Sequence, residues 1–317
     1  MTDAALGLVS LGLIFVGILT GYPMAFTFIF ISLVFGWMGI GDRVVTLMQY
    51  QFFALMRDTT LAAIPLFLFM GFVLEQSGLM ERMFKALRLL LGRVRGSLYL
   101  IVLIVATVFA AATGIVGASV TVLGVMAAPI MMSSKYDTRM SAGAIAAGGT
   151  LGILIPPSIL LIVMGPVVGV PVSDLFTAAI IPGLMLSIVY ILYTLIRSYL
   201  NPSLGPPLTL EEIAETTAAE KLKELMLGII PVTVVIAFTL GVIIAGIATP
   251  TDAAACGALA SLVLAVLYRR MPWASFKHCV YSTLVLSAMI MFLLGSANFF
   301  GAVFSRLGSA NLLTEFL

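Results

Sequence analysis

Two apolar segments of this sequence are interrupted by glycine, proline and hydroxyl residues, which bind ligands through neutral oxygen atoms and free backbone groups. The interrupting residues are Thr113, Gly114, Gly117 and Ser119 in the first segment, and Gly149, Thr150, Gly152, Pro156, Pro157 and Ser158 in the second. In hydrocarbon, unpaired backbone N–H and C=O groups are costly, so a broken helix survives only where protein buries it or where it lines a cavity. The two breaks therefore predict a binding site built from half-helices, as in secondary transporters.

The first interruption has the chemistry of a site for a small hard cation such as Na⁺. Sodium takes oxygen ligands, which the hydroxyls of Thr113 and Ser119 and the unwound backbone at Gly114 supply without a buried carboxylate. Gly149 and Thr150 would complete this site from the opposite side. The alternative is that these small residues merely permit close helix packing.

The second interruption predicts a helix that stops and restarts. Pro156 removes a backbone donor and frees a carbonyl group one turn earlier. Pro157 and Ser158 then begin a new half-helix, whose free N–H groups attract an anion such as a substrate carboxylate. A purely structural kink is the alternative.

The composition is that of a polytopic, all-α membrane protein. Of the 317 residues, 62% are hydrophobic and only 9% are charged, whereas a soluble domain is about one quarter charged. Cys256, Cys279 and the single histidine, His278, do not make a metal or haem framework. The predicted spans offer no acid–base or nucleophile set, and no phosphate-binding GxxxxGK[ST] motif occurs, so we expect neither an enzyme nor an ATPase. No cofactor besides a coupling ion and no nucleic-acid partner is expected.

Basic residues predict the topology. All of the 16 Lys and Arg residues except Arg43, Arg57 and Arg306 fall in four segments, 82–95, 135–139, 197–223 and 269–277. Because positively charged loops stay in the cytoplasm, we place these segments inside and the N-terminus outside. Residues 97–133 both start and end beside inside segments, so they predict a re-entrant hairpin. Two crossings joined by an outer turn are the alternative.

The remaining spans follow from apolar length. We expect a first repeat at 1–200, a cytoplasmic linker at 201–224 with a short helix capped by Thr209, and the start of a second repeat at 225–317. Within the first repeat the expected parts are scaffold helices in 4–79, with 42–57 at the interface, a basic amphipathic arm at 80–95, the hairpin at 97–133, a broken helix at 140–165 and a helix at 175–197. The second repeat would cross at 225–247, 252–268 and 278–300.

The repeat itself is predicted from three matched pairs. Pro23 pairs with Pro250, Gly71 with Gly295, and Gly78 with Gly301, each pair about 225 residues apart and in opposite predicted orientation, as in an inverted repeat. Chance similarity in a chain rich in leucine and glycine is the alternative. If the repeat is real, its second tip and second proline break fall past Leu317. We therefore expect this chain to carry half of a transport site and to be inactive alone.

Two carboxylates need separate interpretations. Asp252 directly follows Thr249-Pro250-Thr251, where we expect it to favour a helix N-terminus rather than to bind an ion. Glu75 is the carboxylate deepest inside a predicted span, and intramembrane acids are functional candidates. It also lies close enough to the cytoplasmic end to reach the surface, so both interpretations stay open.

Four motifs carry a family resemblance: IPLFLFMG at 64–71, FAAATGIVGAS at 109–119, GGTLGILIPPSI at 148–159 and GIATPTDAAA at 246–255. Together they resemble the large membrane subunit of TRAP (tripartite ATP-independent periplasmic) transporters. The resemblance implies an elevator-type, Na⁺-coupled importer of organic acids in the bacterial inner membrane. It also implies two partners, a small four-helix membrane subunit and a periplasmic solute-binding protein. A channel or a structural helical subunit of a larger membrane complex is the alternative.

The chain departs from the family pattern in its hydroxyl content. Gly148-Gly149 stands where a Ser-Ser pair is frequent, and the 113–119 tip has fewer serines than is usual. The departure implies that backbone carbonyl groups supply more of the coordination, which leaves the ligand set open.

Overall fold

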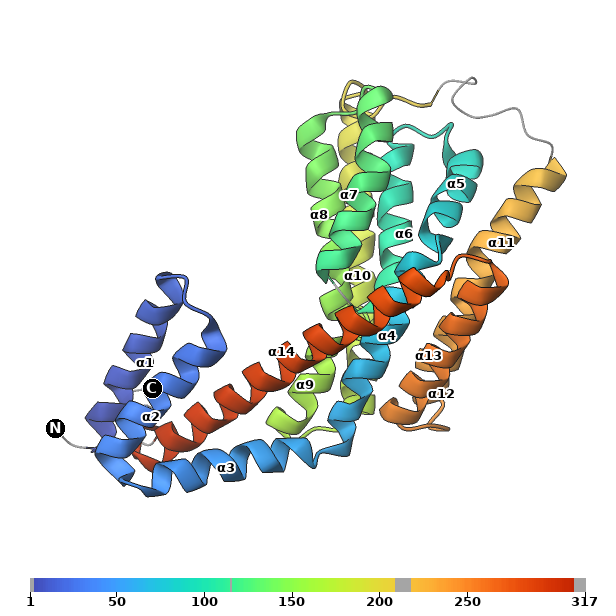
Figure 1. Cartoon of the computed structure of the whole chain (residues 1–317). Helices are drawn as coiled ribbons and strands as arrows, with labels where there is room; N and C mark the ends of the chain where they lie inside the picture. The colour runs from blue at the N-terminus through green and yellow to red at the C-terminus, as the bar shows by residue number, and fades with distance from the viewer. Residues whose placement is uncertain (1–2, 115, 209–217, 311–317) are drawn as a thin grey trace. The chain divides into compact units, whose positions relative to one another are not determined.

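The computed structural model describes residues 3–114, 116–208 and 218–310, and regular structure in these ranges is helical (Figure 1). Six helical stretches there are long and apolar enough to cross a membrane. The predicted all-α, polytopic class is therefore confirmed. The chain forms two compact units, one made of residues up to Thr59 with those from Val285 onward, and one made of Thr60–Leu284.

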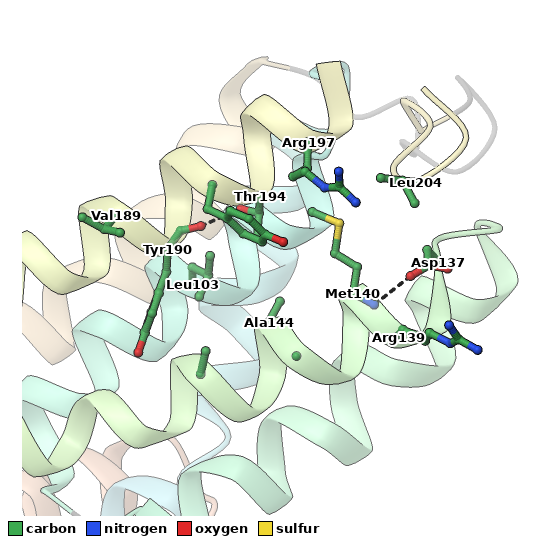
Figure 2. Close-up of a pocket in the computed structure, with 13 residues that line it drawn as sticks. Leu103, Asp137, Arg139, Met140, Ala144, Val189, Tyr190, Thr194, Arg197 and Leu204 are labelled. Atoms are coloured by element: carbon green, nitrogen blue, oxygen red, sulfur yellow. Dashed lines mark hydrogen bonds between the residues drawn. The ribbon is translucent and has the colours of Figure 1, made fainter. Parts of the chain in front are cut away.

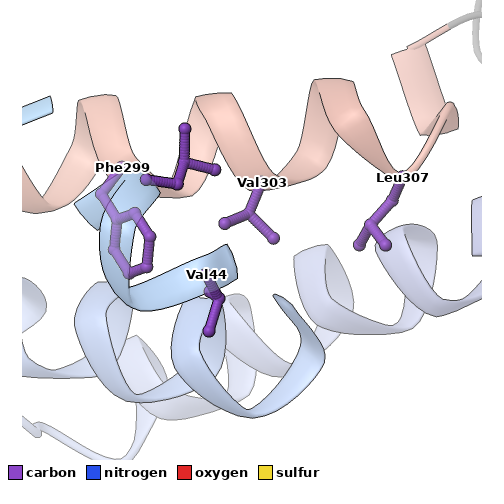
Figure 3. Close-up of a cluster of buried hydrophobic side chains, with 5 residues drawn as sticks. Val44, Phe299, Val303 and Leu307 are labelled. Atoms are coloured by element: carbon purple, nitrogen blue, oxygen red, sulfur yellow. The ribbon is translucent and has the colours of Figure 1, made fainter. Parts of the chain in front are cut away.

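The first unit contains three N-terminal helices and the C-terminal part of a long one. They are α1 (Asp3–Leu19), α2 (Met24–Ile40), α3 (Arg43–Met56) and α14 (Trp273–Arg306). Its core joins Val44 of α3 to Phe299 and Val303 of α14 (Figure 3). The segment predicted to lie at the interface, 42–57, contains α3, with Val44 buried on one side and Phe53 exposed on the other. Apolar side chains on both faces suit an element that lies between protein and lipid.

The second unit begins with the elements that carry the predicted site. They are the 3₁₀ turn η1 (Thr59–Ala62), α4 (Ala63–Gln76), α5 (Leu79–Leu91), α6 (Ser97–Thr113), α7 (Val116–Ser133), α8 (Thr138–Leu154), α9 (Ile159–Val168) and α10 (Val172–Leu200). Helices α6, α7, α8 and α10 form a bundle in which α8 contacts the other three (Figure 1). The segment predicted as an amphipathic arm, 80–95, contains most of α5, and the apolar face of this helix, with Met83 and Phe84, is buried against protein.

The predicted hairpin is present as α6 and α7. Helix α6 has 17 residues, which gives about 25 Å at 1.5 Å per residue, against about 30 Å of hydrocarbon. Helix α7 has 18 residues, no more than the shortest of the candidate spanning stretches. The hairpin tip at Gly114 lies beside the α8–α9 break, halfway along the 31-residue stretch Thr138–Val168. This geometry suits a hairpin that enters and returns on one side.

The second unit is completed by α11 (Ala218–Ile236), the π-helical turn η2 (Ala237–Gly241), α12 (Val242–Ile244), α13 (Pro250–Leu267) and the start of α14. Helix α11 begins at Ala218, within the range predicted as a linker with a short helix, 201–224. Thr209, its predicted helix cap, lies outside the described residues. The predicted span 278–300 is part of one longer helix, because no proline interrupts α14 between Trp273 and Arg306.

Hydrogen bonds bring three of the basic segments to one end of this unit. The backbone N–H of Asp137 donates to Leu204 O at 3.1 Å, and that of Gly96 donates to Gly205 O at 2.9 Å. The fourth segment joins the first, because the Arg82 guanidinium carbon lies 4.9 Å from the centre of the Tyr268 ring. The shared end agrees with the prediction that all four segments lie on one side of the membrane.

Candidate functional site

The hairpin tip brings two hydroxyls together in a buried position. Helix α6 ends at Thr113, and Gly114 turns the chain with a positive φ of 62°. The Thr113 hydroxyl donates to Phe109 O at 2.8 Å, and Thr113 Oγ1 lies 3.5 Å from Ser119 Oγ. Both side chains are buried, with 4% and 6% of their surface exposed. The tip therefore presents two oxygen atoms from opposite arms of the hairpin.

The α8–α9 break follows from its two prolines. Ile155 leaves the helical conformation, and its N–H still donates to Leu151 O at 2.8 Å. Neither Pro156 nor Pro157 has an N–H group to continue the helix. Ser158 is fully buried, and its hydroxyl donates to Ile153 O at 2.5 Å. This bond spans the break and satisfies one carbonyl that the prolines leave without a backbone donor.

The tip and the break touch each other. A Cβ atom added at Gly114 would overlap the carbonyl oxygen of Pro157 and would lie 3.4 Å from Ser158 Cα. The two interruptions, about 40 residues apart in sequence, are thus in contact. We call the oxygen atoms of the buried residues Thr113, Ser119 and Pro157 on the two sides of this contact the buried cluster. Such oxygens are the ligands that hard cations take, and broken helices hold ions in this way in membrane transporters.

Other predicted site residues lie elsewhere. Gly149 packs against Val120 of the hairpin, since a Cβ there would come within 3.0 Å of Val120 Cα, so its small size serves helix packing. Gly117 and Thr150 are exposed, and the Thr150 hydroxyl donates to Ala147 O at 2.8 Å. These two contribute no side chain to the buried cluster. Gly152 and Pro156 are buried, and the side chain of Pro156 offers no oxygen ligand.

A carboxylate that the sequence left open shares a cavity with the tip. Glu75 of α4 lines a space of about 10 Å³ together with Thr113 and Ser119. The cavity is closed by Gly71, Met80, Phe109 and Val122. The sequence signal was the position of Glu75 inside a predicted span. Only the packing of α4 against the hairpin brings Glu75 to this cavity.

Asp252 has the capping role predicted for it. The Thr249 hydroxyl accepts from the Asp252 N–H at 3.2 Å, and it donates to the Asp252 carboxylate at 2.6 Å. The first bond satisfies one free N–H group in the first turn of α13, and the second holds the capping hydroxyl in position. Among the described residues, no three His, Cys, Asp or Glu side chains form a metal-binding group.

At the basic end, Tyr268 links α13 to α11. Its hydroxyl donates to Leu227 O at 2.8 Å. Burial raises the pKa of Tyr268, and the nearby Arg82 opposes that rise in part. The phenol therefore stays neutral at physiological pH and keeps this hydrogen bond.

A larger groove opens between α6, α8 and α10, with a volume of about 630 Å³ (Figure 2). Figure 2 shows Arg139 and Arg197 at one end of it, beside Leu204, and Val189 toward the other. The carboxylate of Asp137 also lines the groove, but it accepts the N–H of Met140 at 2.8 Å as the cap of α8. This groove is separate from the cluster at the hairpin tip.

Comparison with known proteins gives one consistent family. Residues 11–317 match the family model described as the DctM component of the tripartite ATP-independent periplasmic transporter. The chain is 33% identical over 247 residues to the C4-dicarboxylate TRAP transporter large permease protein DctM of Pseudomonas aeruginosa, an alignment that covers 77% of this chain and 56% of the relative.

Two further relatives differ in the compound that their names give. The 2,3-diketo-L-gulonate TRAP transporter large permease protein YiaN of Escherichia coli is 30% identical, over 92% of this chain and 67% of the relative. The sialic acid TRAP transporter large permease protein SiaM of Vibrio cholerae is 27% identical, over 96% of this chain and 69% of the relative. Alignments to these three relatives thus span 56% to 69% of the relatives' lengths.

Proposed function

The chain belongs to the DctM component family of the tripartite ATP-independent periplasmic transporters, and we propose that it forms part of a Na⁺-coupled import path for a small organic acid. Its family and the six apolar spanning stretches among its described residues make it a multi-pass membrane protein of a transporter and not an enzyme. The coupling ion, the substrate and the transport mechanism are what we propose.

The contact between the hairpin tip and the helix break carries the proposal. Thr113 and Ser119 place two buried hydroxyl oxygens 3.5 Å apart, and the Pro157 carbonyl lies against Gly114. One Na⁺ bound near these oxygens would have neutral oxygen atoms as its main ligands. Its affinity would then depend on whether a second set of half-helices closes the site, which suits an ion that must bind and leave in each cycle.

The substrate is proposed to be a carboxylate. The names of the relatives above give a C4-dicarboxylate, a sialic acid and a diketo-gulonate, which are all acids. Helix α9 begins at Ser158 beside the tip, and its N-terminus offers partial positive charge to such an anion. Charge attraction of this kind selects the class of substrate but not its size.

The mechanism is proposed to be an elevator movement. The hairpin, the broken helix and α10 belong to one compact unit, and α1 to α3 belong to the other. Helix α4, which we grouped with the scaffold from sequence, lies in the unit of the hairpin, so the moving part would include it. We propose that the chain lies in the bacterial inner membrane, where a small four-helix subunit braces the scaffold. A periplasmic solute-binding protein delivers the substrate.

Uptake by proteoliposomes tests the proposal. The complete transporter, reconstituted with both partner proteins, should accumulate a radiolabelled C4-dicarboxylate, sialic acid or another matching acid only when an inward Na⁺ gradient is imposed. A K⁺ gradient of equal size is the control. Downhill flux that ignores Na⁺ would instead support the channel alternative, and an absence of flux with intact assembly would support a structural subunit.

A further inference from the structure

Glu75 lies between two spaces of different kinds. On one side is the small cavity that it shares with Thr113 and Ser119. On the other side is an open groove of about 480 Å³, which Glu75 lines together with Glu81 and Arg270. The groove opens toward the end of the unit that carries the basic segments, since Arg270 belongs to one of them.

The cavity has the size for one ion or one water molecule. Its volume is about 10 Å³, close to the volume of roughly 10–15 Å³ that a single water needs. Bare Na⁺ is no larger than a water molecule. Two of the polar lining groups, Thr113 and Ser119, are neutral, so Glu75 supplies the negative charge at the cavity.

Electrostatics favours a role for this carboxylate in ion transfer. An acid inside a spanning helix is costly unless it pairs or lines a pathway. His278 of α14 is close enough to interact with it electrostatically, but no hydrogen bond or salt bridge joins Glu75 to another described residue in the structure. A passing cation would compensate the charge each time that it occupies the cavity.

We propose that Glu75 is a transient ligand for a monovalent cation, which it passes between the hairpin tip and the open groove. This inference rests on the proposed function, and it adds a charged ligand and an exit route to a site of neutral oxygens. The tip holds the ion, and the carboxylate lowers the barrier for its release toward the groove. Selectivity between Na⁺ and K⁺ stays with the small cavity.

Ion-dependent stability of the purified complete transporter, in which this chain is either unaltered or a variant, tests this inference without transport. Thermal unfolding in detergent is followed at increasing NaCl, with choline chloride keeping ionic strength constant. Glu75→Gln should raise the Na⁺ concentration for half-maximal stabilisation about tenfold, the scale of one lost interaction with a charged group. Glu75→Asp keeps the charge and should retain most of the response. The matched control is Glu81→Gln, because Glu81 lines the groove but not the cavity.

The outcomes separate this inference from the proposed function. If the transporter with the unaltered chain gains no stability from Na⁺, the ion site fails and the inference fails with it. If the transporter responds to Na⁺ but Glu75→Gln behaves like Glu81→Gln, the ion site stands and the inference is overturned. If Glu75→Gln lowers the melting temperature equally at all Na⁺ concentrations, Glu75 only pairs with His278, which also overturns it.

The groove in Figure 2 supports a second, independent inference. Its charged end carries Arg139 and Arg197 together with the Asp137 carboxylate, so two positive charges face one negative charge there. Its walls are apolar, with Leu103 and Ala144 on one side and Val189 on the other. Val189 and Tyr193 are 56% and 60% exposed on α10, a helix that has the length and composition of a membrane span. The groove therefore opens toward lipid along its length and ends in positive charge.

We infer that this groove binds an anionic phospholipid. The two guanidinium groups match a phosphate diester, which accepts hydrogen bonds from such donors. One acyl chain would lie along the apolar walls. Basic pockets between helices on the cytoplasmic side bind anionic headgroups for the same reason.

Native mass spectrometry of the purified chain tests the lipid site. Phosphatidylglycerol should bind at a lipid concentration about tenfold lower than phosphatidylcholine does. This is the scale of one charge-assisted contact that phosphatidylcholine does not make. The double variant Arg139→Gln/Arg197→Gln should abolish this preference. Lys135→Gln, an exposed change in the same basic segment that does not line the groove, should preserve it. Equal retention of both lipids, or equal binding of free glycerol phosphate, would overturn the inference.

Discussion

The carbonyl oxygen of Pro157 occupies the space where a side chain on Gly114 would begin. The hairpin tip therefore reaches the helix break only because residue 114 has no Cβ atom. Its φ of +62° is a second reason, since this backbone region strains residues other than glycine. One glycine thus provides both the turn of the hairpin and its contact with the broken helix.

Replacing this glycine should separate the tip from the break. We expect Gly114→Ala to lower the free energy of unfolding by about 1–3 kcal/mol, from strain at positive φ and the overlap with Pro157. Denaturant unfolding in micelles measures this. Gly117→Ala is the control, because a Cβ there meets nothing within 4 Å. Equal losses in both variants would show that the Gly114–Pro157 contact does not matter.

Removing one hydroxyl from the tip should weaken ion coupling. Thr113→Val or Ser119→Ala deletes an oxygen with little change in volume. We expect the free energy of Na⁺ binding to weaken by about 1–3 kcal/mol, as for an unmade buried hydrogen bond. The Na⁺ dependence of uptake by the complete transporter is the measurement. Thr177→Val serves as the control, because that exposed hydroxyl only donates to Ser173 O at 2.9 Å. Unchanged Na⁺ dependence in both tip variants would move the ion site elsewhere.

The re-entrant path predicts sided access to the tip. A cysteine introduced at Gly117, which is exposed in this structure, should react poorly with a membrane-impermeant thiol reagent from the periplasmic side unless the carrier faces outward. Cys256→Ser and Cys279→Ser remove the native thiols first. Full periplasmic labelling in every transport state would indicate an ordinary outer loop and two complete crossings.

The cap of α13 should matter for stability and not for ion binding. Thr249→Ala removes the hydroxyl that accepts from Asp252 N–H, and we expect a loss of about 1 kcal/mol in unfolding free energy. Asp252→Asn should cost less, because the threonine still caps the helix. A large shift in Na⁺ affinity in either variant, at constant stability, would assign Asp252 to the ion site instead.

Local chemistry made much of this protein predictable from sequence. A membrane solvent demands helices with paired backbones, so long apolar stretches and their length indicated the all-α class. Breaks at Gly114 and at Pro156-Pro157 followed from residue type, because glycine tolerates positive φ and proline lacks the N–H group. The basic segments predicted which loops share a side, since charge alone decides that bias.

Only the tertiary structure decided which of these features meet. Gly149 and Thr113 looked equivalent as site residues, yet one packs against Val120 and the other lines a cavity. Glu75 joins that cavity from a separate helix, and Thr150 is left exposed. Such differences depend on the rotation and close approach of helices distant in sequence. Side-chain packing fixes that approach, and the residue types at each break do not encode it locally.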